Sequence, residues 1–183
     1  MTDDRQENIY KKLEASFHIQ DHWNFEKSDF EKKRFEQMLK FCNYVPHKTI
    51  LEIGCAEGHF TKYLTKISQS VTAVDVSSIA IEYARKKVLE ATFKVLKLEE
   101  IPIPEEKYDL VICSETLYYL LDQKGAIDYL KRLGKNLVTS SFLMTNWGAY
   151  ISEFYLARLH PLKRKVLYSI PERKLTIVSL WEL

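Results

Sequence analysis

Hydrophobic residues follow a helical spacing before Thr49 and a strand-like spacing after it. In residues 28–42 the apolar side chains recur at intervals of three and four, which places them on one face of a helix. These side chains are Phe35, Met38, Leu39 and Cys42. Ser28 and Glu31 have the spacing of a capping box, which begins a helix. The aromatic-rich segment 21–28 lacks any period, so we expect the first part of the chain to be helical with one interruption.

From Thr49 onward, short apolar runs alternate with segments of helical spacing. The runs predict strands at residues 49–55, 71–76, 91–98, 108–115, 137–144, 163–170 and 174–183. The other segments predict helices at residues 59–70, 77–88, 125–133 and 147–160, and the prolines in 99–107 indicate a loop. This alternation is typical of an α/β protein with a doubly wound, mostly parallel sheet. The short turn at 171–174 makes the last two of the seven strands an antiparallel C-terminal hairpin.

The length of 183 residues suits one domain, 1–183, with a single hydrophobic core. Within it we expect a helical lid or cap at 1–48 and a Rossmann-like core at 49–183. The 27 basic and 25 acidic side chains leave a net charge of +2, which gives no reason to expect a nucleic acid or a membrane as partner.

Targeting and metal signals are missing from the sequence. No apolar stretch approaches the roughly 18 residues of a membrane span, and the polar N-terminus lacks the apolar region of a signal peptide. Cys42, Cys55 and Cys113 are odd in number and lack metal-ligand spacing, which favours reduced thiols. We therefore expect a cytoplasmic protein without a metal site.

The turn after the first predicted strand is rich in small residues. Gly54, Ala56 and Gly58 let a ligand approach the backbone closely, and such a turn presents amide groups to a carboxylate or phosphate. Asp75 ends the second predicted strand, where its carboxylate could accept two ribose hydroxyls or could only cap the next helix. Glu52 could bind an ammonium group or could only hold neighbouring backbone amides. Together these residues predict a site for a nucleoside cofactor.

Several segments resemble one enzyme class. LEIGCAEGHFT (51–61), VTAVDVS (71–77) and YDLVICSETLYYL (108–120), with the terminal hairpin, resemble the class I S-adenosylmethionine-dependent methyltransferases. Together with DHWNFEKSDFEKKRF (21–35), they are similar to the nodulation-type N-methyltransferases, which methylate an amino sugar of a chitooligosaccharide. The resemblance implies a Rossmann-like methyltransferase fold and S-adenosyl-L-methionine as the cofactor.

The resemblance also implies which residues hold the cofactor. Residues around the turn after the first strand would surround the methionine part of S-adenosyl-L-methionine. Residues after the later strands would contact its adenosine part. The first set is Glu52, Gly54, Cys55, Ala56 and Gly58; the second is Asp75 on the ribose and Val76 on the adenine, with Leu98, Glu99 and Ser114. The family usually has an acidic residue where this chain has Lys97, which cannot accept a hydrogen bond from the adenine amine. Glu99 or a backbone carbonyl is the alternative acceptor.

The end of the fourth predicted strand supplies the candidate catalytic residues. Parallel sheets bind ligands beyond the carboxyl ends of their strands. We expect Glu115 to orient or deprotonate the nucleophile there, unless it only caps a loop. Tyr118 and Tyr119 could stack on a sugar or could only cover the core. Residues that would contact the acceptor, or would merely pack between helices, are Trp23, Phe25 and Arg34 of the lid and Trp147 in the aromatic segment 145–155.

These features favour methyl transfer to an amino group of a sugar, an oligosaccharide or another small polar acceptor, by a monomer or homodimer. A small-molecule O-methyltransferase and a catalytically inactive S-adenosylmethionine-binding module remain alternatives. A nicotinamide-dependent oxidoreductase is disfavoured, because its fingerprint needs glycines where this chain has Ala56 and His59.

Overall fold

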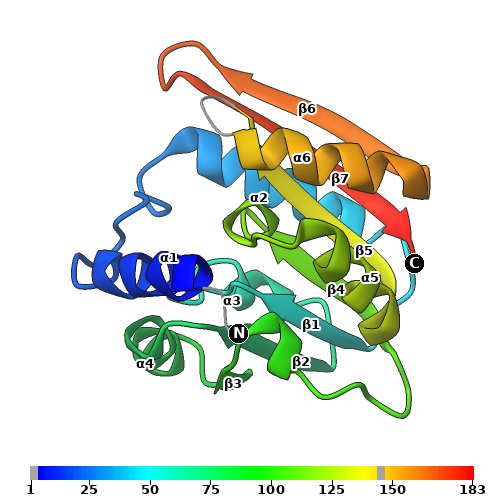
Figure 1. Cartoon of the computed structure of the whole chain (residues 1–183), viewed down its shortest axis with the longest axis horizontal. Coiled ribbons are helices and arrows are strands. Elements are labelled where there is room, and N and C mark those ends of the chain that lie inside the picture. The colour runs from blue at the N-terminus through cyan, green and yellow to red at the C-terminus, as the bar shows by residue number, and fades with distance from the viewer. Residues whose placement is uncertain (1–3, 144–146) are drawn as a thin grey trace.

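A seven-stranded sheet forms the centre of the protein, whose computed structural model describes residues 4–143 and 147–183 (Figure 1). The strands are β1 (Thr49–Ile53), β2 (Ser70–Asp75), β3 (Thr92–Val95), β4 (Tyr108–Ser114), β5 (Gly134–Phe142), β6 (Lys163–Ser169) and β7 (Lys174–Glu182). Their order in the sheet is β3-β2-β1-β4-β5-β7-β6. The first five strands are parallel, and β7 is antiparallel to both β5 and β6. The predicted sheet with its C-terminal antiparallel hairpin is confirmed.

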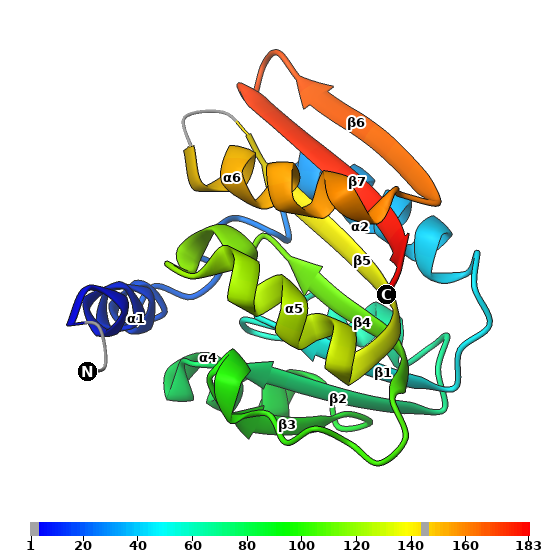
Figure 2. The ribbon, with the colours of Figure 1, turned by 45° about the vertical axis from the view of Figure 1, so that its right-hand side comes forward.

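Helices cover both faces of this sheet (Figure 2). On one face lie α5 (Gln123–Leu133) and α6 (Trp147–Leu156), and on the other lie α2 (Asp29–Cys42) and α4 (Ser78–Lys87). The remaining helices are α1 (Asp4–Ser16), α3 (Thr61–Leu64) and the 3-10 turns η1 (Leu98–Glu100), η2 (Leu117–Tyr119) and η3 (Ala157–Leu159). Ser77 caps α4, because its side chain accepts a hydrogen bond from the amide of Ala80.

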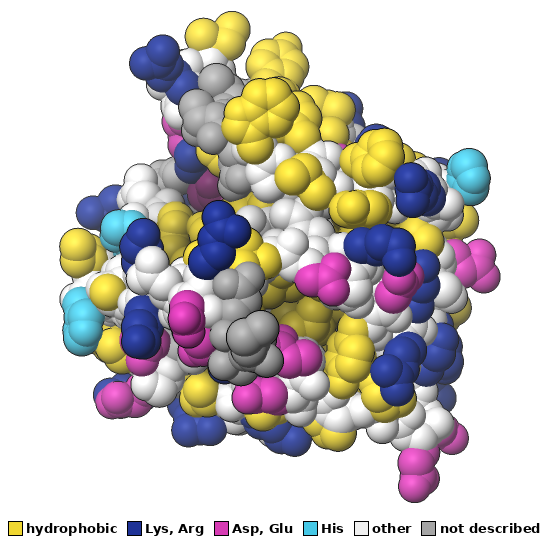
Figure 3. Space-filling model, viewed as in Figure 1, with side chains coloured by type: hydrophobic (Ala, Val, Ile, Leu, Met, Phe, Trp, Pro, Cys, Tyr) yellow, Lys and Arg dark blue, Asp and Glu magenta, His cyan; other side chains and the backbone are white. Residues whose placement is uncertain are grey.

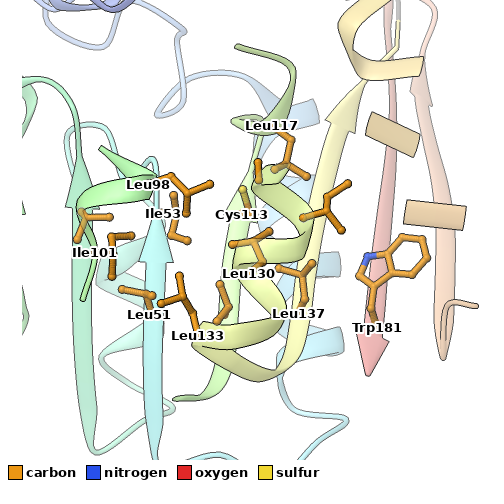
Figure 4. Close-up of a cluster of buried hydrophobic side chains, with 14 of the residues drawn as sticks. Leu51, Ile53, Leu98, Ile101, Cys113, Leu117, Leu130, Leu133, Leu137 and Trp181 are labelled. Atoms are coloured by element: carbon orange, nitrogen blue, oxygen red, sulfur yellow. The ribbon is translucent and has the colours of Figure 1, made fainter. Parts of the chain in front are cut away.

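Successive residues of the central strands belong to opposite layers of the core. Leu51 packs on the α5 side with Leu130 and Leu133 (Figure 4). Its neighbour Ile50 packs on the α2 side. Trp181 of β7 is fully buried in the α5-side cluster, and its indole nitrogen donates to Oγ1 of Thr139 (3.0 Å). Because both faces are buried, the central strands read as continuous apolar runs rather than as alternating ones.

The largest departures from the hydrophobic pattern are one helix and one strand that are much shorter than predicted. The helix expected at 59–70 is only the single turn α3, because the amides of Lys66 and Ile67 bond to carbonyls three residues back and tighten the chain before β2. The third strand ends at Val95, and Leu98 is buried in η1 instead of continuing the strand. Short apolar segments are ambiguous between these outcomes, since periodicity alone does not set where a helix or strand ends.

The start of α2 agrees with only half of the predicted capping box. The Ser28 hydroxyl accepts from the amide of Glu31 (3.2 Å), as expected. The other half of the prediction, a hydrogen bond from the Ser28 amide to the Glu31 carboxylate, is wrong. The Glu31 carboxylate binds Arg34 and Lys174 (both 2.7 Å), and the Ser28 amide donates to the carbonyl of Asn24. The end of the fifth predicted strand, Met144, and the first two residues of the aromatic segment 145–155 lie outside the described residues.

Helix α1 lies beyond the carboxyl ends of the central strands (Figure 1). Gln6 anchors it to the segment after β4, since its amide nitrogen donates to the Tyr119 carbonyl (3.0 Å) and its oxygen accepts from the Leu121 amide (2.8 Å). The far end of α1 is tied to the start of α4, where Ser78 donates to Glu14 (2.8 Å). Neither α1 nor any other described helix is both long and apolar enough to cross a bilayer.

Replacing Leu130 by alanine tests the packing of α5. The side chain is fully buried, so Leu130→Ala should lower the free energy of unfolding by about 2–5 kcal/mol. Leu89→Ala is the matched control, because that leucine is 84% exposed and should change stability by less than about 0.5 kcal/mol. Urea denaturation of both variants measures the difference, and equal losses would contradict this account of the core.

Candidate active site

A cavity of about 400 Å³ lies at the carboxyl ends of β1, β2 and β4, alongside α1. Its apolar and aromatic lining comprises Tyr10, Leu13, Phe17, Trp23, Phe25, Ile53, Val74, Val76, Leu96, Leu98, Tyr118, Tyr119, Leu120 and Phe142. Its charged lining residues are Glu31, Arg34, Asp75, Glu115 and Lys174. A mostly apolar cavity of this size with a few polar groups is typical of a small-molecule site.

The turn after β1 forms one wall of this cavity. Gly54 has a φ of +74°, and a Cβ atom at this position would lie 2.1 Å from Oγ1 of Thr116. Ala56 also has a positive φ, 48°, which a small side chain tolerates better than a branched one. The Gly54 amide donates to the carbonyl of Val74 (2.8 Å), which joins the turn to the end of β2. The glycine is therefore required here by both backbone conformation and space.

Asp75 connects the ends of β1 and β2. Its Oδ2 accepts from the amide of Ala56 (2.9 Å), and its Oδ1 accepts from the amide of Ser77 (2.9 Å). Burial raises the pKa of Asp75 above 3.8, and the two amides oppose that rise because they favour the carboxylate. Each carboxylate oxygen has acceptor capacity left, so Asp75 can hold the turn and still accept ligand hydroxyls.

The residues predicted to hold a cofactor divide between the cavity wall and its surroundings. Those that line the cavity are Gly54, Ala56, Asp75, Val76, Leu98 and Ser114. Four others are not among the lining residues: Glu52, Cys55, Gly58 and Glu99. The ammonium of Lys97 pairs with Glu7 of α1 and lies 5.6 Å from the centre of the Tyr10 ring. Lys97 therefore holds α1 against the edge of the cavity.

Glu52 is a buried carboxyl group behind the turn. Its Oε2 accepts a 2.5 Å hydrogen bond from the hydroxyl of Thr61, which opens α3. Burial raises the pKa of Glu52 from 4.5 to about 8, although the Thr61 hydrogen bond acts in the opposite direction. The carboxyl group therefore keeps its proton over a pH range in which an exposed glutamate is ionised.

Glu115 occupies the turn after β4 with its backbone in the left-handed region, at a φ of 53°. Its amide donates to the carbonyl of Ser140 (3.0 Å), and its Oε2 accepts from the Phe142 amide (2.7 Å) and the Tyr118 hydroxyl (3.1 Å). Its Oε1 is buried and has no hydrogen-bond partner in residues 4–143 and 147–183. Burial raises the pKa of Glu115, and the charge of Arg34 opposes that rise. One carboxylate oxygen is thus fixed by two hydrogen bonds, whereas the other keeps its full acceptor capacity.

Three of the four predicted acceptor residues line the cavity, namely Trp23, Phe25 and Arg34, and the ring centres of Trp23 and Phe25 lie 6.0 Å apart. Trp147 does not line it. This tryptophan is 83% exposed on α6, next to Tyr150, where hydrophobic side chains gather on the surface (Figure 3). Arg34 lines the cavity but is 2% exposed, and its donors contact Glu31 and two serines.

Sequence reasoning missed two groups of lining residues. The first belongs to α1 and the residue after it, where Tyr10, Leu13 and Phe17 recur at i, i+3 and i+7, a signal that predicts one helix face. The second includes Phe142 and Thr176, which meet in the antiparallel pairing of β5 with β7. No local pattern reveals that pairing, because the two residues are far apart in the chain.

A family model described as Nodulation protein S (NodS) matches residues 5–145. Nodulation protein S of Azorhizobium caulinodans is 30% identical over 128 residues, which cover 66% of this chain and 61% of that protein. The Rhizobium tropici protein of the same name is 32% identical over 152 residues, covering 76% of this chain and 63% of its own. These matches thus span somewhat less than two thirds of each relative's length.

A solved structure is similar over nearly the whole chain. It is the N-methyltransferase NodS from Bradyrhizobium japonicum WM9 in complex with S-adenosyl-L-homocysteine, with a TM-score of 0.85 and 25% identity. The similarity covers 96% of this chain and 98% of that one.

The raised pKa of Glu52 predicts a loss of stability with rising pH. Between pH 4.5 and about 8, the folded protein keeps a proton that the unfolded chain releases, so the free energy of unfolding should fall across this range. Glu52→Gln should remove that part of the pH dependence in urea denaturation. The exposed Glu90, changed to glutamine, is the matched control and should keep it. An unaltered pH dependence in Glu52→Gln would contradict the prediction.

Proposed function

Because the chain belongs to the Nodulation protein S family, we propose that it transfers a methyl group from S-adenosyl-L-methionine to an amino group of a polar acceptor. The preferred acceptor is an amino sugar of an oligosaccharide, by analogy with the chitooligosaccharide N-methyltransferases that the sequence resembles. One observation carries the proposal. Glu115, which has one carboxylate oxygen without a hydrogen-bond partner in the described residues, lines the same cavity as the glycine turn and Asp75.

The residues at one end of the cavity fit the cofactor. Asp75 retains acceptor capacity for ribose hydroxyls, while Val76, Leu96 and Leu98 supply apolar surface for an adenine ring. The close approach at Gly54 leaves backbone rather than side chain facing a ligand. When bound, S-adenosyl-L-methionine supplies a methyl group already activated by its sulfonium.

The distribution of charge separates an acceptor end from this cofactor end. Asp75 is the charged lining residue at the ends of β1 and β2. The other four, Glu31, Arg34, Glu115 and Lys174, are joined by contacts from Lys174 through Glu31 and Arg34 to Glu115. An end with both carboxylates and cations can donate to and accept from the hydroxyls and amine of a sugar.

Glu115 would prepare the acceptor for reaction. An amine attacks through its lone pair, so an ammonium must first lose a proton. Oε1 of Glu115 accepts that proton, while Tyr118 and the Phe142 amide hold Oε2 in place. The freed lone pair then forms the N–C bond, and the electrons of the C–S bond remain with sulfur. The pocket contributes alignment and exclusion of water.

The N-terminal segment 1–48 would act as a cap on the core at 49–183. Tyr10, Phe17, Trp23 and Phe25 place aromatic surface on the cavity from this segment. Trp147 stays a prediction as an acceptor contact, and from its exposed position it would meet an acceptor only outside the cavity. A monomer or homodimer remains the expected assembly.

Asp75→Asn tests the ribose contact. The substitution keeps the side-chain shape but removes the charge, so affinity for S-adenosyl-L-homocysteine should fall by about 1.5–3 kcal/mol in calorimetry. Asp128→Asn, on the exposed surface of α5, should leave it unchanged. Unaltered affinity in Asp75→Asn, with the fold intact by thermal melting, would place the ribose elsewhere.

Glu115→Gln tests the proton acceptor and the reaction together. With a free-amine glucosamine oligomer as acceptor, turnover should fall by roughly 10²–10⁴-fold while S-adenosyl-L-homocysteine affinity stays the same. Glu105→Gln, exposed in the loop before β4, is the matched control. Methylation of hydroxyls but not amines by the unaltered protein would favour an O-methyltransferase. Cofactor binding without any turnover would favour an inactive binding module.

A further inference from the structure

Arg34 brings a guanidinium from α2 to the carboxyl end of the sheet. The side chain is 2% exposed, and the guanidinium carbon lies 4.8 Å from the centre of the Phe35 ring. Its Nη1 donates to Oγ of Ser114 (2.5 Å) and of Ser140 (3.1 Å), at the ends of β4 and β5. Its Nε donates to Glu31 (2.7 Å). With its donors so engaged and so little surface free, Arg34 is poorly placed to recognise an acceptor.

The same guanidinium lies beside the proposed proton acceptor. Nε of Arg34 is 3.9 Å from Oε1 of Glu115, within ion-pair range but too far for a hydrogen bond. This Oε1 is the oxygen left without a hydrogen-bond partner in the described parts of the chain, whereas Oε2 is bound on two sides. Arg34 therefore stabilises the charge on Oε1 without occupying its acceptor position.

The groups that face Glu115 differ in sign. Arg34 favours the carboxylate, whereas the nearby carboxylates of Glu31 and Glu153 disfavour it. Tyr118 and Tyr119 of η2 and Cys113 of β4 are the other titratable neighbours. On the far side of Glu31, Lys174 pairs with its Oε1 (2.7 Å) and reduces its negative charge. The equilibrium between the charged and the neutral form of Glu115 thus depends on a row of alternating charges that runs from Lys174 of β7 through Glu31 and Arg34 of α2.

We propose that Arg34 is a positioning residue that acts through Glu115, keeping its carboxylate ionised and its Oε1 directed at the acceptor nitrogen. This inference rests on the proposed function, in which Glu115 takes the proton. It replaces the expectation that Arg34 contacts the acceptor directly. The segment preceding the core then supplies a charge that the reaction needs, in addition to covering the cavity.

Titration of Glu115 in variants of Arg34 tests the proposal. The protein carries carbon-13 in its glutamate carboxyl groups and is saturated with S-adenosyl-L-homocysteine; the Glu115 signal is the one lost in Glu115→Gln. Arg34→Met should raise the midpoint of this titration by about one pH unit or more, because the opposing charge is gone. Arg34→Lys keeps a positive charge and should restore much of the shift. Arg132→Met, at an exposed position of α5, is the matched control and should leave the midpoint of the Glu115 titration unchanged.

Glu31→Gln supplies a test in the opposite direction and does not depend on the folding of Arg34→Met. Removing this competing carboxylate should lower the midpoint of Glu115. Turnover of the glucosamine oligomer should follow the same order, with the acid limb of the kcat profile moving up in Arg34→Met and down in Glu31→Gln. A merely structural role would instead reduce kcat equally at every pH.

The outcomes separate this inference from the function on which it rests. Midpoints that stay within about 0.2 pH units of the unaltered protein in both Arg34→Met and Glu31→Gln would overturn the role of Arg34 even if amines are methylated. Failure of the unaltered protein to methylate any amine would overturn the proposed function, and the titration would still report whether Arg34 controls the charge of Glu115.

Discussion

The hydrogen bond between the Asp75 carboxylate and the Ala56 amide joins the two strand ends on which the cavity is built. The turn after β1 bends through positive φ angles at Gly54, Ala56 and Gly58, a conformation that exposes backbone amides. A backbone amide that is buried without a hydrogen-bond acceptor costs free energy, and the Asp75 carboxylate supplies an acceptor for the Ala56 amide from the neighbouring strand. The same carboxylate also bonds to the amide before α4. The buried side chain of Asp75 therefore fixes the shape of the turn and the start of the next helix. It also retains acceptor capacity for a ligand.

The second constraint is the docking of the N-terminal segment on this edge of the sheet. Charged and polar contacts secure it: Lys97 with Glu7, Gln6 with the chain after β4, and Glu31 with Lys174 of the C-terminal hairpin. These contacts place aromatic side chains on one wall of the cavity and Arg34 beside Glu115. Most are partly exposed and individually weak, whereas Arg34 is fully surrounded. The segment thus contributes both cover and charge to the site.

Membership of the Nodulation protein S family and the seven-stranded sheet agree with what the motifs predict, including the antiparallel hairpin. Lys97 departs from the pattern of the class I methyltransferases that the sequence resembles, and the structure shows what this lysine contacts instead. The resemblance to the class I methyltransferases implies an acidic residue at this position, whereas the ammonium of Lys97 pairs with Glu7 of α1 and Lys97 is not among the lining residues of the cavity. Lys97 thus contributes to the docking of α1 beside the cavity.

The strands, most of the helices and the turn chemistry follow from the amino-acid sequence, because these depend on local spacing and on residues a few positions apart. The sequence marked Gly54, Asp75 and Glu115 for the same reason, since each ends or directly follows a buried strand. Three other features emerge only from the packing of the folded chain: Phe142 lies opposite Thr176, Arg34 lies beside Glu115, and Trp147 lies outside the cavity. These outcomes depend on the register of distant strands and on the docking of α2. Neither leaves a local pattern, because the energy that fixes them comes from contacts between segments remote in the chain.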